Sequence, residues 1–132
     1  MKIISTNIGD RREIDWKGKR VPTGIFKFPV TQPIFLGTKG VMGDEISDKE
    51  YHGGFLQAVY GYSLKQYDFF KPLYPNLEWQ FGMFGENLTI DHLDETKIHQ
   101  GDVFKVGETI LEATVQRDPC MKLGLRFNDM KI

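Results

Sequence analysis

The sequence predicts a single, mainly β domain with one or two short helices, and its many short strands favour a barrel. Its 132 residues are enough for one domain. Fourteen glycines and six prolines are spread along the whole chain, and short apolar runs lie between them. This pattern is typical of many short strands rather than of long helices.

The first predicted elements are a strand and a hairpin. Residues 2–8 have a β-compatible composition and predict the first strand. Residues 15–21 predict a hairpin in which Gly18 supplies the turn, because glycine adopts the positive φ angles that tight hairpin turns need.

Three apolar segments follow the hairpin. Residues 24–30 and 32–36 predict two extended segments. Pro29 and Pro33 place these segments at a sheet edge or a bulge, because proline cannot donate a hydrogen bond to a sheet. Residues 55–60 fit a strand and a helix equally well.

A surface helix is predicted from Ser63 to Lys71. Ser63 and Gln66 fit a capping box at its start, and Pro72 and Pro75 end it. The apolar residues have the spacing of an amphipathic helix: Leu64, Tyr67, Phe70 and Leu73.

The last predicted strands lie in the C-terminal half. Residues 87–90 predict one strand, and residues 103–106 and 109–115 predict a hairpin with a tight turn. The sequence has no internal repeat, linker or low-complexity stretch. We therefore expect residues 1–132 to form a single domain.

The composition excludes several classes of protein. Seventeen basic and eighteen acidic residues give a formal net charge of −1, which argues against a nucleic-acid partner. A single cysteine excludes an intrachain disulfide and a zinc site built from several cysteines. No signal peptide is recognisable, and no apolar run approaches the roughly 18 residues of a membrane span. We expect a cytoplasmic protein with neither a nucleic-acid nor a membrane partner.

The single cysteine is the first candidate for chemistry. Asp118 suits an N-cap and Pro119 the first helical position, so Cys120 is predicted in the first turn of a short helix. The helix dipole, with Arg117 and Lys122 nearby, would favour a thiolate that acts as a nucleophile, persulfide carrier or soft-metal ligand. An inert buried thiol is the alternative.

A histidine followed by two glycines is the second candidate. His52 could donate to an anion or shuttle a proton, because the glycines allow a close approach of the backbone. A loop turn with an incidental histidine is the alternative. His92 and His99 have no partner at a metal-ligand spacing and are interpreted as structural or exposed.

The third candidate is the glycine-containing segment 82–88. Gly85 frees the backbone, and Glu86 and Asn87 offer an acceptor and an amide for a polar ligand. An ordinary glycine turn before a strand is the alternative. Residues 40–45, with Asp48, are interpreted as an acidic turn without EF-hand spacing, so calcium is not indicated.

Taken together and in order, these segments resemble the MOSC domain, named for the C-terminal domain of molybdenum cofactor sulfurases. The resemblance runs from Asp15 to about Phe127 and is strongest to the stand-alone bacterial, YiiM-like branch. Each motif alone is weak, but their order and spacing are specific, and the only cysteine falls on the family's cysteine. The motifs are Asp15-Trp-Lys-Gly-Lys, Thr23-Gly-Ile-Phe-Lys-Phe-Pro-Val30, Gly43-Asp44, Asp48, His52-Gly-Gly-Phe-Leu-Gln-Ala-Val-Tyr60, Phe84-Gly-Glu-Asn-Leu-Thr89, Gly101-Asp102 and Arg117-Asp-Pro-Cys-Met-Lys-Leu123.

The resemblance implies a MOSC-type β-barrel and a molybdenum cofactor (molybdopterin), with pyridoxal phosphate binding as a further family association. Members of this group reduce N-hydroxylated compounds, and others are thought to carry sulfur as a cysteine persulfide. By motif, Cys120 would ligate molybdenum or carry sulfur, and His52 would supply or orient a proton. The residues that would bind the cofactor's phosphate and pterin are Lys27, Asn87 and Arg117, with Gly85 and Glu86 beside them.

Three functions follow from this resemblance. The first is an oxidoreductase for a small N-hydroxylated substrate, supplied with electrons by a separate reductase, because one cysteine cannot hold an iron–sulfur cluster. The second is a sulfur carrier that uses a Cys120 persulfide, and the third is a non-catalytic binding module.

The chain departs from the family pattern at Gln116 and Met121, and most of all at its end. The family continues beyond the cysteine with a segment that closes the barrel, whereas this sequence stops at Ile132. A missing strand would expose a sheet edge. We therefore expect a barrel that is incomplete at the C-terminus: a shortened member, a fragment, or a barrel closed by a partner chain, for example in a homodimer.

Overall fold

The computed structural model describes residues 1–44, 55–117 and 121–127. Within these residues the fold consists mainly of short strands, so the mainly β prediction is confirmed. The strands are β1 (Lys2–Gly9), β2 (Arg12–Trp16), β3 (Lys19–Thr23), β4 (Lys27–Pro29), β5 (Leu36–Gly37), β6 (Gly40–Val41), β7 (Gly61–Ser63), β8 (Leu88–Asp91), β9 (Val103–Val106) and β10 (Thr109–Glu112). The helices are α2 (Leu64–Phe70), α3 (Met121–Phe127) and the 3-10 turns η1 (Phe55–Gln57), η2 (Lys71–Leu73) and η3 (Glu95–Lys97).

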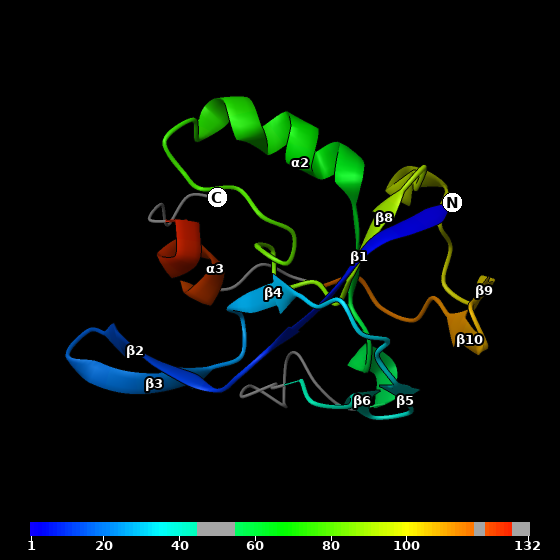
Figure 1. Ribbon diagram of the computed structural model, residues 1–132, viewed down its shortest axis with the longest axis horizontal. Coiled ribbons are helices and arrows are strands. Elements are labelled where there is room, and N and C mark those ends of the chain that lie inside the picture. Colours follow the sequence, from blue (N-terminus) through cyan, green and yellow to red (C-terminus); the bar gives the residue numbers. More distant parts are fainter. Residues whose placement is uncertain (45–54, 118–120, 128–132) are drawn as a thin grey trace.

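The centre of the molecule is a four-stranded sheet with the order β4-β1-β8-β7 (Figure 1). Strand β1 is antiparallel to β4 and β8, while β7 runs parallel to β8. The remaining described strands form three two-stranded ribbons. No closed barrel is therefore detected in the part of the chain that the structure describes, and only the mainly β portion of the predicted fold is confirmed.

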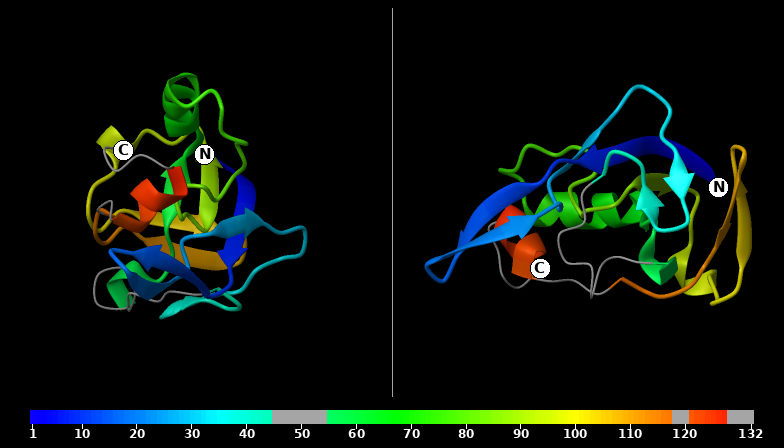
Figure 2. Two further views of the ribbon diagram at one scale, coloured as in Figure 1. Left: turned by 90° about the vertical axis from the view of Figure 1, so that its left-hand side faces the viewer. Right: turned by 90° about the horizontal axis from the view of Figure 1, so that it is seen from below.

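The predicted hairpins lie where the sequence places them, at opposite ends of the molecule (Figures 1 and 2). Ribbon β2–β3 turns at Lys17 and Gly18, whose φ angles of 50° and 77° are those of a tight hairpin turn. Ribbon β9–β10 turns at Gly107, which has a φ of 60°. Both turns were predictable because their chemistry is local.

Of the two prolines predicted at a sheet edge or bulge, only Pro29 lies in an edge strand. Pro29 ends β4, which pairs only with β1 in the described sheet and so forms its edge. Pro33 lies outside any strand, and only Leu36 of the predicted segment 32–36 is in a strand. The ambiguous segment 55–60 begins with the 3-10 turn η1.

The predicted surface helix is confirmed as α2, but its cap differs from the predicted capping box. The Ser63 hydroxyl accepts a hydrogen bond from the Lys65 N–H at 3.2 Å. The Ser63 N–H donates to the Glu95 carboxylate at 3.0 Å, so Glu95 of η3 takes the place predicted for Gln66. Gln66 instead donates to Glu95, at 3.0 Å.

An aromatic core lies between α2, α3 and the segment that follows η2 (Figure 1). Its buried members are Tyr67, Met83, Phe84 and Phe127. The Phe84 and Phe127 ring centroids are 4.9 Å apart, so α3 is packed against the segment that leads into β8. Among the described residues, no helix has the length and apolarity that a membrane crossing requires.

Candidate functional site

Residues 82–87, which lead into β8 and include two members of the aromatic core, form a tight turn that lies against β4. Gly82 and Gly85 have φ angles of 89° and 84°, which disfavour other residues. A Cβ atom at Gly82 would lie 2.7 Å from the Lys27 carbonyl oxygen. Gly82 therefore permits a close approach of this turn to Lys27, one of the predicted site residues.

Glu86 anchors this turn from within. Its side chain is fully buried and accepts hydrogen bonds from the Gly82 N–H at 3.0 Å, the Phe84 N–H at 3.1 Å and the Thr89 hydroxyl at 2.8 Å. It also accepts a hydrogen bond from the Tyr67 hydroxyl. We call these four donors and their acceptor the Glu86 network.

Burial raises the pKa of the Glu86 carboxyl group, and hydrogen bonds from Tyr67, Thr89 and Gly82 oppose this rise. Burial also raises the pKa of Tyr67, and the nearby Glu86 raises it further. The Glu86 network thus holds the turn through neutral donors. Both carboxylate oxygens of Glu86 accept hydrogen bonds from the protein's own hydroxyl and N–H groups.

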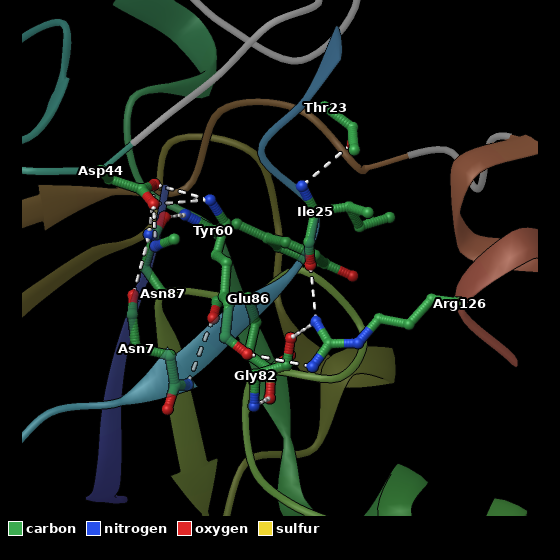
Figure 3. Close-up of polar contacts among 11 residues, drawn as sticks. Asn7, Thr23, Ile25, Asp44, Tyr60, Gly82, Glu86, Asn87 and Arg126 are labelled. Atoms are coloured by element: carbon green, nitrogen blue, oxygen red, sulfur yellow. Dashed lines mark hydrogen bonds and ion pairs between the residues drawn. The ribbon is translucent and has the colours of Figure 1, made fainter. Parts of the chain in front are cut away.

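A second buried carboxylate, that of Asp44, contacts the turn through Asn87. Asp44 accepts from the Lys27 ammonium at 2.7 and 2.8 Å, from the Asn87 amide at 2.8 Å and from the Gly9 N–H at 2.8 Å. The exposed fractions of the Lys27 and Asp44 side chains are only 7% and 2%. Figure 3 shows the contact between Asp44 and Asn87.

Asn87 is itself fixed in orientation. Its amide nitrogen also donates to the Asn7 carbonyl at 3.2 Å, and its side-chain oxygen accepts from the Tyr60 N–H at 3.1 Å (Figure 3). Both donor directions of the amide nitrogen therefore meet acceptors of the chain, one of which is Asp44.

Arg117 adds a second cation to this group. Its guanidinium lies 4.6 Å from the centre of the Tyr60 ring, a cation–π distance. Burial lowers the pKa of the Lys27 ammonium, Asp44 opposes this change, and the charges of Arg117 and Arg126 lower it further. We call Lys27, Asp44, Asn87, Tyr60 and Arg117 the Asp44 cluster.

Arg126 connects helix α3 to both neighbouring segments. Its guanidinium donates to the carbonyls of Ile25 at 2.6 Å, Gly82 at 2.8 Å and Lys27 at 3.0 Å (Figure 3). Burial lowers its pKa to about 10, against a raising contribution from Glu86. Because the three acceptors belong to two segments, this one side chain fixes α3, β4 and the 82–87 turn relative to one another.

The structure brings together three of the predicted cofactor-binding residues: Lys27, Asn87 and Arg117. Gly85 and Glu86 lie in the adjoining turn, and whether they contact a cofactor stays a prediction. Cys120 and His52 lie outside the described residues, as do Asp118 and Pro119. Helix α3 begins at Met121, directly after Cys120 in the sequence.

The remaining histidines are exposed, as predicted. The side chains of His92 and His99 have exposed fractions of 77% and 80%. Within residues 1–44, 55–117 and 121–127, no group of three His, Cys, Asp or Glu side chains is placed to hold a metal ion.

Sequence reasoning missed two residues of this region. Asp44 was part of a motif but was interpreted only as a member of an acidic turn, and Arg126 was not singled out at all. The pairing of Asp44 with Lys27 spans 17 residues of sequence, and Arg126 reaches acceptors about a hundred residues away. The only available signal was the presence of Asp44 within a family motif.

The fold and the site together define a mainly β domain with a buried lysine, a half-buried arginine and an oriented amide, a chemistry suited to anionic ligands. The family model described as "MOSC domain" matches residues 48–131. The chain belongs to the MOSC domain family.

The relatives of the chain support the YiiM-like branch predicted from the sequence. The chain is 33% identical over 125 residues to "Uncharacterized protein YflK" of Bacillus subtilis, covering 95% of the chain and 56% of that protein. It is 34% identical over 109 residues to "Protein YiiM" of Escherichia coli, covering 81% of the chain and 49% of that protein. A protein named "Reductase" from Gibberella moniliformis is 33% identical over 114 residues, which are 83% of the chain and 20% of that protein.

The fold of a solved structure also supports the YiiM-like branch. The crystal structure of YiiM from Geobacillus stearothermophilus matches with a TM-score of 0.73 and 26% sequence identity, covering 96% of the chain and 56% of that structure. The chain thus spans about half the length of YiiM and YflK, the first of the curated relatives that it matches.

Proposed function

We propose that this chain binds a molybdenum cofactor and takes part in the reduction of N-hydroxylated compounds, with Cys120 as the molybdenum ligand. Membership of the MOSC family and the similarity to a fungal protein named "Reductase" support this proposal. The observation that carries it is the convergence of Lys27, Asn87 and Arg117 in the Asp44 cluster.

The donors of the Asp44 cluster fit such a cofactor. Lys27 and Asn87 already converge on the two oxygens of one carboxylate, at 2.7 to 2.8 Å. The same ammonium and amide donors suit the oxygens of a phosphate group. Arg117, half-buried and stacked on Tyr60, would add a planar donor for the same group.

The residues of the chain would then have separate roles. Lys27 and Arg117 bind the anionic part of the cofactor, Asn87 orients it, and Cys120 supplies a soft thiolate to the metal. His52 delivers or orients a proton at the substrate oxygen. A bound molybdenum cofactor supplies the two-electron chemistry by which an N–OH group, two protons and two electrons become N–H and water. A separate reductase supplies the electrons.

Molybdenum and sulfur content per chain test this function directly. The wild type, expressed in a host that makes the cofactor, is expected to hold molybdenum and to reduce an N-hydroxylated amidine with an artificial electron donor. Cys120→Ser should lose most of this activity, and Arg117→Ala should retain less cofactor. Asp68→Ala, at an exposed position of α2, is the control and should match the wild type.

A wild type without molybdenum, or a Cys120→Ser variant with full activity, would count against the proposal. An additional sulfur atom on Cys120 in the intact mass, without molybdenum, would instead support the sulfur-carrier alternative. That mass has to be recorded without added thiols, because they remove a persulfide.

A further inference from the structure

The ammonium of Lys27 and the amide of Asn87, which the proposed function assigns to the cofactor, are both directed at Asp44. The carboxylate lies 2.7 and 2.8 Å from the ammonium nitrogen and 2.8 Å from the amide nitrogen. The Gly9 N–H, 2.8 Å away, fixes the carboxylate from a third side. Three donors from β1, β4 and the 82–87 turn therefore meet one internal anion.

The position of Asp44 is set by the backbone around it. Its own N–H donates to the Val41 carbonyl at 3.1 Å, directly after β6. At the end of β1, a Cβ atom at Gly9 would lie 2.8 Å from the Phe26 carbonyl oxygen, so this strand packs tightly against the segment that enters β4. The carboxylate is thereby held between β1 and β4 by contacts that do not depend on a ligand.

We propose that Asp44 is a specificity-determining residue whose carboxylate competes with the phosphate group of the ligand for the donors of Lys27 and Asn87. This inference rests on the proposed function, which brings a phosphate to these donors. A phosphate oxygen that binds the Lys27 ammonium would also lie beside the Asp44 carboxylate, because the ammonium and the carboxylate are in contact. The negative charges of the phosphate and of Asp44 would then repel each other strongly, since water is largely excluded there. Asp44 thus weakens phosphate binding and disfavours doubly charged phosphates more than singly charged ones.

A purely structural ion pair makes the opposite prediction. If Asp44 served only to balance Lys27, its removal would leave a buried charge without compensation, and both stability and ligand affinity would fall. In our inference stability falls but phosphate affinity rises, because an external anion takes the place of the carboxylate. The two effects have opposite signs and can be measured on the same variant.

The test compares wild type with Asp44→Asn, using methyl phosphate and dimethyl phosphate as probes. Above neutral pH methyl phosphate carries two negative charges and dimethyl phosphate one. Affinity is measured by calorimetry and by the rise of the thermal midpoint with probe concentration. Asp10→Asn is the control, because it changes the net charge by the same amount at an exposed position.

We expect Asp44→Asn to bind methyl phosphate about tenfold more tightly than wild type, with a smaller gain for dimethyl phosphate. Asp10→Asn should show neither gain. If Asp44→Asn does not fold alone, Asp44→Ser removes the same charge with less volume, and methyl phosphate should restore the folding of either variant.

Several results would overturn the inference. Equal or weaker methyl phosphate binding by a folded Asp44→Asn overturns it, and molybdenum in the wild type would still support the proposed function. Absence of binding to both proteins, or failure of both variants to fold at any methyl phosphate concentration, also overturns it. The molybdenum content of the wild type is measured separately and decides the proposed function on its own.

Discussion

Glu86 and Asp44 are two buried carboxylates that contact one tight turn, Glu86 from within it and Asp44 through Asn87, and their partners differ. Glu86 accepts from two hydroxyls and two backbone N–H groups, all of them neutral. Asp44 accepts from a lysine ammonium, a side-chain amide and one backbone N–H. Three of the four donors to Glu86 lie within four residues of it, so this carboxylate mainly fixes the local structure of the turn. The buried ammonium group beside Asp44 is a charged donor that an anionic ligand could also use.

The comparison separates scaffold from site. The Glu86 network shapes the turn that carries Asn87, and Arg126 fixes that turn against β4, which carries Lys27. The Asp44 cluster is held on this framework. Changes to the framework should therefore lower stability first, and changes to the Asp44 cluster should alter ligand binding.

The largest loss of stability is expected for Glu86→Ala. It leaves two hydroxyls and two backbone N–H groups of the Glu86 network without their acceptor, at a cost of about 3 kcal/mol in the free energy of unfolding. Urea denaturation measures this loss. Glu108→Ala, at the exposed end of the β9–β10 hairpin, should change stability by less than about 0.5 kcal/mol. Equal stability of the two variants would contradict the role given to Glu86.

Loss of the Arg126 contacts is expected to be the next largest effect. Arg126→Met leaves three carbonyls without a charged donor, which should cost about 2 kcal/mol. Arg12→Met is a matched control: the Arg12 and Arg126 guanidinium groups both lie about 5 Å from the Phe26 and Phe28 rings, at 4.9 to 5.5 Å, but Arg12 is exposed. Should Arg12→Met cost as much, the aromatic contacts rather than the carbonyl contacts would stabilise α3.

A smaller, pH-dependent difference should separate the two carboxylate regions. The pKa of Glu86 is raised from 4.5, so the folded state binds its proton more tightly than the unfolded state does. Stability contributed by the protonated form is lost as the pH rises above 4.5, and the stability of wild type relative to Glu86→Gln should fall over that range. The pKa of Lys27 is lowered from 10.5, so the folded state binds this proton less tightly.

The Lys27 region should therefore respond with the opposite sign. As the pH rises towards 10.5, the stability of wild type relative to Lys27→Met should increase, because deprotonation is easier in the folded state. Thermal unfolding at a series of pH values measures both differences. Parallel pH profiles for wild type, Glu86→Gln and Lys27→Met would show that neither group titrates differently on folding.

The two regions also differ in how far the sequence could predict them. Strand β1 and the hairpins β2–β3 and β9–β10 were predicted because apolar alternation and turn glycines act over a few residues. The order of strands in the central sheet could not be predicted, because β1 pairs with β8 across more than eighty residues of sequence. Pairing at such distances depends on packing that no local pattern encodes.

The candidate site was predicted through motifs, and its internal contacts were not. Lys27, Asn87 and Arg117 were selected by resemblance, and the structure places them in one cluster. The contacts of Asp44 and Arg126 depend on how distant segments meet, so neither role followed from the sequence. The barrel was expected from strand number, but a count of strands does not specify which edges meet.

The smallest predicted effect tests the cap of α2, where a local pattern gave the wrong partner. The sequence paired Ser63 with Gln66, whereas the Ser63 N–H donates to Glu95. Ser63→Ala should cost about 1 kcal/mol, because the Lys65 N–H loses its acceptor. Glu95→Ala should cost about 0.5 kcal/mol and Gln66→Ala less, because Gln66 makes only an exposed contact to Glu95. If urea denaturation shows the reverse order for these two variants, the local capping box is the cap in solution, and the link between η3 and α2 contributes nothing to stability.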